Sequence, residues 1–195
     1  MVIDKAKFEL IREELEHFEE NREHVIKLSR EIIQLSKRII YGLQRNEDVK
    51  NLIENIKTKV KDLPEEHYDT DIQQIALQEY VEALCFYGFI KNKQLPSKDE
   101  LNVNSETYLL GLCDMVGELV RQAVNSVINK RYNEALEIKS FVEEFYNEVL
   151  KLNLRNGQLR KKVDSVKWNL KNLEELALNF SLKYGTPLGC LLYTS

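Results

Sequence analysis

The chain has 195 residues, enough for one domain with a substantial core, and a net charge of -4. Only seven glycines and three prolines interrupt it while 31% of its residues are charged, which favours an all-α protein and argues against a sandwich, a barrel or alternating βαβ units. The acidic balance excludes a uniformly basic surface. No apolar run approaches the roughly 20 residues that cross a membrane, and the charged N-terminus is unlike a signal peptide, so we expect a cytoplasmic protein without a membrane partner.

The first predicted helix is unusually long. Apolar residues spaced by three and four predict a helix from about Asp4 to Leu43, roughly 60 Å at 1.5 Å per residue. A rod of that length cannot bury its apolar stripe inside a small monomer, so we expect partner subunits. Arg22 interrupts the stripe and would place a guanidinium in an interface or a lumen.

Five further helices follow in chain order. Asp48 is a plausible cap for the second, and Pro64 with the acids after it predicts the start of the third. Gly111 and Gly117 weaken the fourth, so we expect close approach of a neighbouring backbone at both. The helices after the first are predicted at about 49–62, 64–91, 105–130, 133–152 and 159–184. We predict a single domain over 1–189 and an unstructured tail at 190–195 that need not be native.

Two glutamates, which we call the acid pair, interrupt the apolar face of the third predicted helix. Helical spacing places these residues on one face: Ile72, Ile75, Glu79, Glu82, Phe86 and Ile90. A buried carboxylate is costly unless it is paired, protonated or bound to a cation, and a second one a turn away adds to that cost. A divalent metal ion would relieve both problems. The alternative is that Glu79 and Glu82 face solvent or pair with Lys or Arg.

Cations are concentrated in two parts of the chain. Residues 21–61 carry ten Lys and Arg against five Asp and Glu, a local charge of +5, and residues 151–172 carry seven against one, a local charge of +6. Either part could bind a polyanion if the fold brings its cations to one face, and solvated helix faces are the alternative. The candidate binding residues are Arg22, Lys27, Arg30, Lys37, Arg38, Arg160, Lys161 and Lys162.

Nucleophilic catalysis has little support. The cysteines, Cys85, Cys113 and Cys190, are widely spaced and form no CxxC pair, so neither a disulfide framework nor a zinc site is predicted. Apolar neighbours make Cys85 and Cys113 core thiols. The chain contains no GxGxxG, P-loop, GxSxG or HExxH motif.

Four blocks of sequence stand in the order expected of one family. They are REHVIKLSR (22–30) with SKR (36–38), LQEYVEA (77–83), YLLG (108–111) with GEL (117–119) and VNSV (124–127), and NL (153–154) with LRKK (159–162) and DSVK (164–167). Together they resemble the translin family, and its translin-associated factor X (Trax) branch in the archaeal form more than translin proper. The resemblance covers most of residues 20–185.

The resemblance implies a fold and an activity. The implied fold is an elongated antiparallel bundle of about six or seven helices that assembles into a hollow homo-oligomer, an octamer, with single-stranded RNA or DNA bound inside. A second translin-like subunit is a further candidate partner. For the Trax branch it implies a metal-dependent endoribonuclease in which Glu79 and Glu82 are catalytic and hold Mg²⁺ or Mn²⁺, hard cations that prefer oxygen ligands.

The chain departs from the family at the third acid. Family enzymes carry it in a Tyr-Asp-Gly step, and the corresponding residues here are Tyr146, Asn147 and Glu148. Asn147 offers a carbonyl oxygen but no charge, so we expect weaker metal binding if it is the third catalytic residue. Glu144, one turn earlier, is the candidate third metal ligand, and Glu148 is another.

A second polar stripe, on the helix predicted at 105–130, offers further candidates. It consists of Asp114, Glu118, Arg121 and Asn125. Asp114 and Glu118 could join the metal site if the stripe faces the same cavity, whereas a salt bridge to Arg121 is the simpler expectation for Glu118. Two other functions stay open: a non-catalytic protein that binds single-stranded nucleic acid, favoured by Asn147, and a purely structural helical scaffold.

Overall fold

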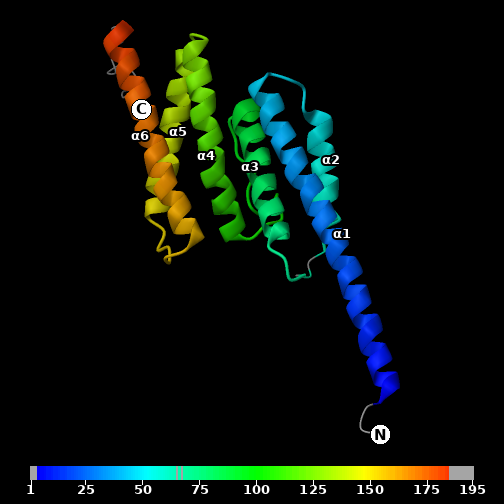
Figure 1. Ribbon diagram of the computed structural model, residues 1–195. Coiled ribbons are helices and arrows are strands. Elements are labelled where there is room, and N and C mark those ends of the chain that lie inside the picture. The colour runs from blue at the N-terminus through cyan, green and yellow to red at the C-terminus, as the bar shows by residue number, and fades with distance from the viewer. Residues whose placement is uncertain (1–3, 65, 67, 185–195) are drawn as a thin grey trace. The chain divides into compact units, whose positions relative to one another are not determined.

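The computed structural model describes residues 4–64, 66 and 68–184, which form six α-helices (Figure 1). The all-α prediction and the expected helix number are therefore confirmed. The chain divides into two compact units, residues 1–111 and 112–195. The predicted tail, 190–195, lies outside the described residues, and a single domain over 1–189 stays a prediction. Within the described residues, no helix is long and apolar enough to cross a membrane.

The first unit is built on α1 (Lys5–Gln44), which packs against α2 (Lys50–Lys61) and α3 (Ile72–Asn92). The 40 residues of α1 confirm the predicted long helix. Its C-terminal half supplies the buried side of the stripe, including Val25, Ile32 and Ile39. Its N-terminal half extends past α2 and α3, as Figure 1 shows.

The start of α3 corrects the prediction, because the helix begins at Ile72 and not at Pro64. Two described residues near this start are held by other contacts: the Gln73 side chain donates to the Pro64 carbonyl at 2.6 Å, and Tyr68 is buried. The Thr70 hydroxyl accepts a bond from the Ile72 N–H. Short polar side chains of this kind compete with a helix for its backbone donors and shift its start to a later residue.

Helix α4 (Ser105–Ile128) starts in the first unit and continues into the second. The Asn104 side chain accepts a bond from the Thr107 N–H and caps the helix. Gly111 confirms the predicted close approach, since a Cβ there would lie 2.7 Å from the Val81 side chain. The prediction for Gly117 is wrong: a Cβ there would meet no atom of the described residues within 4 Å.

The second unit consists of the rest of α4 with α5 (Tyr132–Leu150) and α6 (Gln158–Tyr184). Its core is aliphatic, with Ile138 and Val142 from α5 and Val166 and Leu173 from α6 all buried. A polar contact accompanies this packing, because the Gln122 side chain donates to Glu134 at 2.7 Å. The buried residues recur every three or four positions, as the periodicity of the sequence predicts.

Candidate acidic site and basic helix faces

The acid pair lies on the most deeply buried stretch of the first unit. Glu82 is only 9% exposed, and every residue from Tyr80 to Phe86 is buried. Glu79, one turn earlier on α3, is half-buried. The structure confirms that Glu82 departs from the rule that acids face solvent. The predicted face is not uniformly buried, since Ile75 is 47% exposed.

Cys85, in the same buried stretch as Glu82, and Tyr108, which interacts with Cys85, are both poorly hydrated. Cys85, one turn after Glu82, is buried, and desolvation raises the pKa of its thiol to about 12. Desolvation also raises the pKa of Tyr108, on α4, to about 12, and the Tyr108 hydroxyl donates to the Pro96 carbonyl at 2.8 Å. A dry environment of this kind strengthens any interaction of a carboxylate with a cation.

The candidate third ligands belong to the other unit and lie on its surface. Glu144, Asn147 and Glu148 on α5 are all exposed, and Glu148 accepts a bond from Lys151 at 2.6 Å. In the part of the chain that the structure describes, no three His, Cys, Asp or Glu side chains form a group that could hold a metal ion. Of the predicted metal ligands, the two carboxylates of α3 therefore remain. Mg²⁺ is commonly held by one or two carboxylates with waters and a substrate phosphate, so this set fits it.

The polar stripe of α4 has cation partners in its own unit. The Asp114 carboxylate pairs with Lys162 of α6. Glu118 lies 3.6 Å from Arg121, so the predicted salt bridge is confirmed. These contacts explain the polar positions as packing and surface pairing within the second unit.

Four of the predicted cations share the exposed face of α1. Lys27, Arg30, Lys37 and Arg38 are all exposed, and at 100° per residue they fall within about one quadrant of the helix. We call them the α1 cation face. Arg22 differs from them, because it is half-buried and pairs with Glu19 and Glu23 at 3.5 and 3.7 Å.

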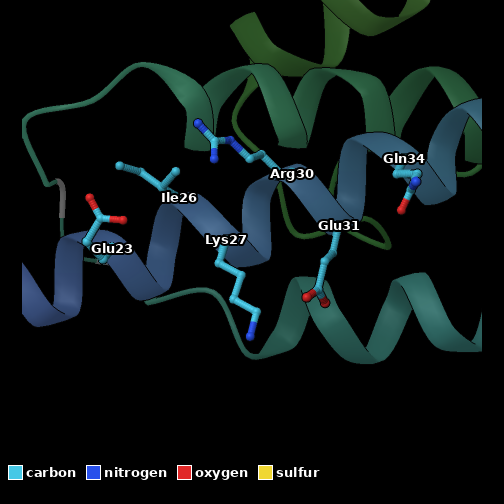
Figure 2. A pocket seen from close by; sticks show the side chains of 6 residues that line it. All are labelled: Glu23, Ile26, Lys27, Arg30, Glu31 and Gln34. Carbon is cyan, nitrogen blue, oxygen red and sulfur yellow. The ribbon is translucent and has the colours of Figure 1, made fainter.

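An open depression of about 350 Å³ runs along this helix. Figure 2 shows its six lining side chains, all of them from α1: Glu23, Ile26, Lys27, Arg30, Glu31 and Gln34. Glu31 points towards α2, where Lys59 donates to it at 2.5 Å and holds the pKa of its carboxyl below the ordinary value. The charge of Glu31 is therefore balanced by Lys59, and Lys27 and Arg30 supply the cations that line the depression.

The second predicted basic patch is smaller than expected. Arg160 and Lys161 are exposed on α6, and Arg160 lies 3.9 Å from Asp164. Lys162 is half-buried and paired with Asp114. Its ammonium already has a carboxylate partner, so the structure places Lys162 in the packing of α4 against α6 and not with the exposed cations.

Two exposed aromatic residues were missed in the sequence. Tyr41 is 47% exposed and follows Lys37 by one turn, on the α1 cation face. Trp168 is 64% exposed on α6, with the Lys171 ammonium 5.6 Å from its ring centroid. Nucleobases stack on aromatic side chains that lie beside cations. The signal was present in the sequence, because Tyr41 follows Lys37 by four residues and Arg30 by eleven, spacings of about one and three helical turns that place all three on one side.

Comparison with known proteins identifies the family. Residues 20–184 match the translin family. Translin of Gallus gallus is 28% identical over 151 residues, covering 69% of this chain and 65% of translin, and translin-associated protein X of Pongo abelii is 27% identical over 161 residues, covering 63% and 56%. The chain thus spans less than two thirds of the length of these relatives.

Two solved structures share the fold. Apo-NeC3PO has a TM-score of 0.82 and 33% identity, over 88% of this chain and 95% of the other. A complex of AfC3PO with duplex RNA has a TM-score of 0.80 and 23% identity, over 92% and 99%. With the family match over 165 of the 195 residues, the conclusion is direct: this chain belongs to the translin family.

Proposed function

We propose that the protein binds single-stranded RNA along the α1 cation face and cleaves it in a divalent-metal-dependent reaction that needs Glu79 and Glu82, as a member of the Trax branch. The burial of Glu82 is the observation that carries the catalytic part. Family membership supports the nucleic-acid part, together with the similar fold of a protein solved with duplex RNA. Single-stranded DNA is a second candidate ligand.

Binding rests on the exposed cations of α1. From Lys27 to Arg38 the helix rises about 16 Å, so its four cations can contact successive phosphates of one strand. Each contact releases counterions, which makes binding depend on salt. Tyr41, in line with these cations, offers a ring for base stacking. Contacts of both kinds are insensitive to base identity, and we expect little sequence specificity.

Cleavage rests on the acid pair. Glu79 and Glu82 would hold Mg²⁺ or Mn²⁺ through their carboxylate oxygens. The chemistry that such an ion supplies is activation of water and neutralisation of charge that develops at phosphorus. The buried residues from Tyr80 to Phe86 exclude bulk water from one side of the carboxylates, which strengthens their electrostatic effect on a bound phosphate.

Binding without cleavage is the alternative, and one observation favours it. The position of the family's third acid is occupied by Asn147, which is exposed, and the described residues contain no third acid grouped with Glu79 and Glu82. The protein would then hold a strand through phosphate contacts alone. Its binding would survive removal of metal and leave the RNA whole.

A cleavage assay separates the two. Purified protein is incubated with a labelled single-stranded RNA, and with its duplex, in Mg²⁺, in Mn²⁺ and in EDTA. We expect metal-dependent cleavage of the single strand that Glu82→Gln abolishes and that Glu118→Gln, a partly exposed acid of α4, leaves unchanged. Intact RNA in both metals excludes the nuclease and leaves the binding protein, whereas equal cleavage by Glu82→Gln excludes the catalytic role of the acid pair.

The assembly is a separate part of the proposal. The family resemblance and the long apolar stripe of α1 support a homo-oligomer, with eight subunits as the expected number, and a second translin-like subunit is a further candidate. Light scattering tests this directly. A stable monomer at micromolar concentration would exclude a closed shell, although it would not affect the chemistry assigned to Glu82.

A further inference from the structure

The N-terminal segment of α1, residues 5–21, carries an apolar stripe that the rest of the described chain leaves largely uncovered. Residues 4–20 are all exposed, and Figure 1 shows this part of α1 extending past α2 and α3. Three large apolar side chains lie bare on it: Phe8, Ile11 and Leu15 are 56%, 48% and 61% exposed. Exposed apolar side chains are unfavourable in water, so a row of them on a helix indicates a surface that binds another molecule.

The stripe has the spacing of a helix–helix interface. Phe8, Ile11, Leu15 and Phe18 are separated by three, four and three residues, which is the pattern of two interlocking helices. Its last member already contacts the core of the first unit, since the ring centroids of Phe18 and Tyr68 are 5.4 Å apart. The segment is therefore anchored to the first unit at its C-terminal end.

The charges of the segment are divided between its two halves. Residues 5–12 hold three cations and one acid, a net charge of +2. Residues 13–20 hold five glutamates and no Lys or Arg, a net charge of -5. Such a distribution is complementary to itself when a second copy runs in the opposite direction, and repulsive when it runs in the same direction.

We propose that the N-terminal segment pairs with the same segment of a second copy as an antiparallel two-helix coiled coil. Ile11 packs against Leu15 of the second copy, and Phe8 joins the cluster of Phe18 and Tyr68. On one edge Lys5 lies beside Glu19 of the second copy at both ends, with Arg12 beside its own counterpart between them, and on the other edge Glu14 lies beside its own counterpart. Parallel pairing would instead place Lys7 beside Arg12, and Glu14 beside Glu19, which are like charges. The antiparallel contact is two-fold symmetric, so it closes after two chains.

This interface deepens the proposed assembly and is independent of the proposed RNA binding and cleavage. The residues that match the translin family begin at residue 20, after nearly all of the segment. Neither the acid pair nor the α1 cation face includes a residue before position 21. Loss of the pairing therefore leaves RNA binding and cleavage by each subunit in place.

Cysteine cross-linking tests the partner and its direction together. Ile11→Cys and Leu15→Cys are made in the full chain with Cys190→Ser, because Cys85 and Cys113 are buried. We expect a disulfide-linked dimer when the two variants are co-expressed and oxidised, and at least about tenfold less from either variant alone. Leu10→Cys, at a position that is also exposed but about 100° around the helix from Ile11, serves as the control.

A second measurement needs no cysteine. Ile11→Glu places a charge in the stripe, and it should lower the mass seen by light scattering at a given concentration, while Leu10→Glu should match the wild type. Strong self-cross-linking of Ile11→Cys would show a parallel pair and overturn the proposal. So would the absence of mixed dimers, or an unchanged mass for Ile11→Glu, as expected if another kind of partner covers the stripe.

Discussion

Gly111 lets α4 approach α3 so closely that a Cβ at this position would lie 2.7 Å from the Cβ of Val81 and 2.8 Å from the Gln78 carbonyl oxygen. These two α3 residues flank Glu79 in the sequence and precede Glu82. The position of the acid pair thus depends on a glycine of another helix, some thirty residues later in the chain.

Replacement of this glycine tests that dependence. Gly111→Ala should lower the free energy of unfolding by about 1–3 kcal/mol, because the Val81 side chain and the α3 backbone must move. Gly117→Ala is the matched control: it lies on the same helix, is exposed and meets no described atom within 4 Å. It should raise stability by about 0.5–1 kcal/mol through helix propensity. Urea unfolding measures both, and equal effects would contradict the packing of α4 on α3.

Lys161 and Lys162 are neighbours with different roles. Lys162→Met removes the half-buried pairing with Asp114, so it should cost about 1–2 kcal/mol of stability with little effect on RNA binding. Lys161→Met should leave stability within about 0.5 kcal/mol and weaken binding, because Lys161 is exposed. Thermal unfolding and RNA titration of both variants check this. If Lys162→Met weakens RNA binding and leaves stability unchanged, Lys162 contacts RNA and is not a packing residue.

The α1 cation face should control the salt dependence of binding. For a single strand, each phosphate contact contributes about 0.7 to the slope of log affinity against log salt. Arg30→Ala with Lys37→Ala should therefore weaken binding and reduce the magnitude of the slope by about 1.4. Lys50→Ala with Lys57→Ala removes two exposed cations of α2 and is the control. If both double variants show the same slope of log affinity against log salt, the RNA strand does not bind along the α1 cation face.

The buried thiol of Cys85 and phenol of Tyr80 predict that the folded protein loses stability at high pH. Burial raises the pKa of Cys85 from 9.0 to about 12 and that of Tyr80 from 10.0 to about 12. A group whose pKa is higher in the folded state than in the unfolded state contributes stability that is complete below the unfolded value and is lost as pH rises through the folded value. The free energy of unfolding should fall steadily between about pH 9 and pH 12, and urea unfolding at several pH values measures it. A constant value across this window would mean that these groups are hydrated.

Thiol labelling gives an independent check of the same burial. In the Cys190→Ser protein, Cys85 and Cys113 should react with a thiol reagent at pH 8 only as fast as the protein opens, since burial raises the pKa of both to about 12. Denaturant should release both thiols at once. Rapid labelling of the native protein would contradict a closed core around Glu82.

The sequence alone was sufficient for most of the fold. Apolar periodicity located all six helices, because amphipathic helices bury one face each. It failed at the start of α3, where Thr70 and its neighbours hold the chain in an irregular path that burial of Tyr68 stabilises. It also failed at Gly117, since a glycine that permits close packing and one that faces solvent look alike in one sequence.

The site was predictable only where it depends on one helix. The spacing of Glu79 and Glu82 on α3 and of the cations on α1 is fixed by local geometry, and both sets lie where the pattern indicated. The role of Lys162 depends on Asp114, 48 residues away in the chain. Pairings of that kind are set by tertiary packing, which periodicity does not encode.

Anomalous diffraction from a crystal of the protein soaked with Mn²⁺ would show whether the acid pair holds a metal ion. We expect an anomalous peak at the carboxylates of Glu79 and Glu82. No peak on this face of α3, or a peak only at exposed acids such as Glu144, would contradict a metal site at the acid pair.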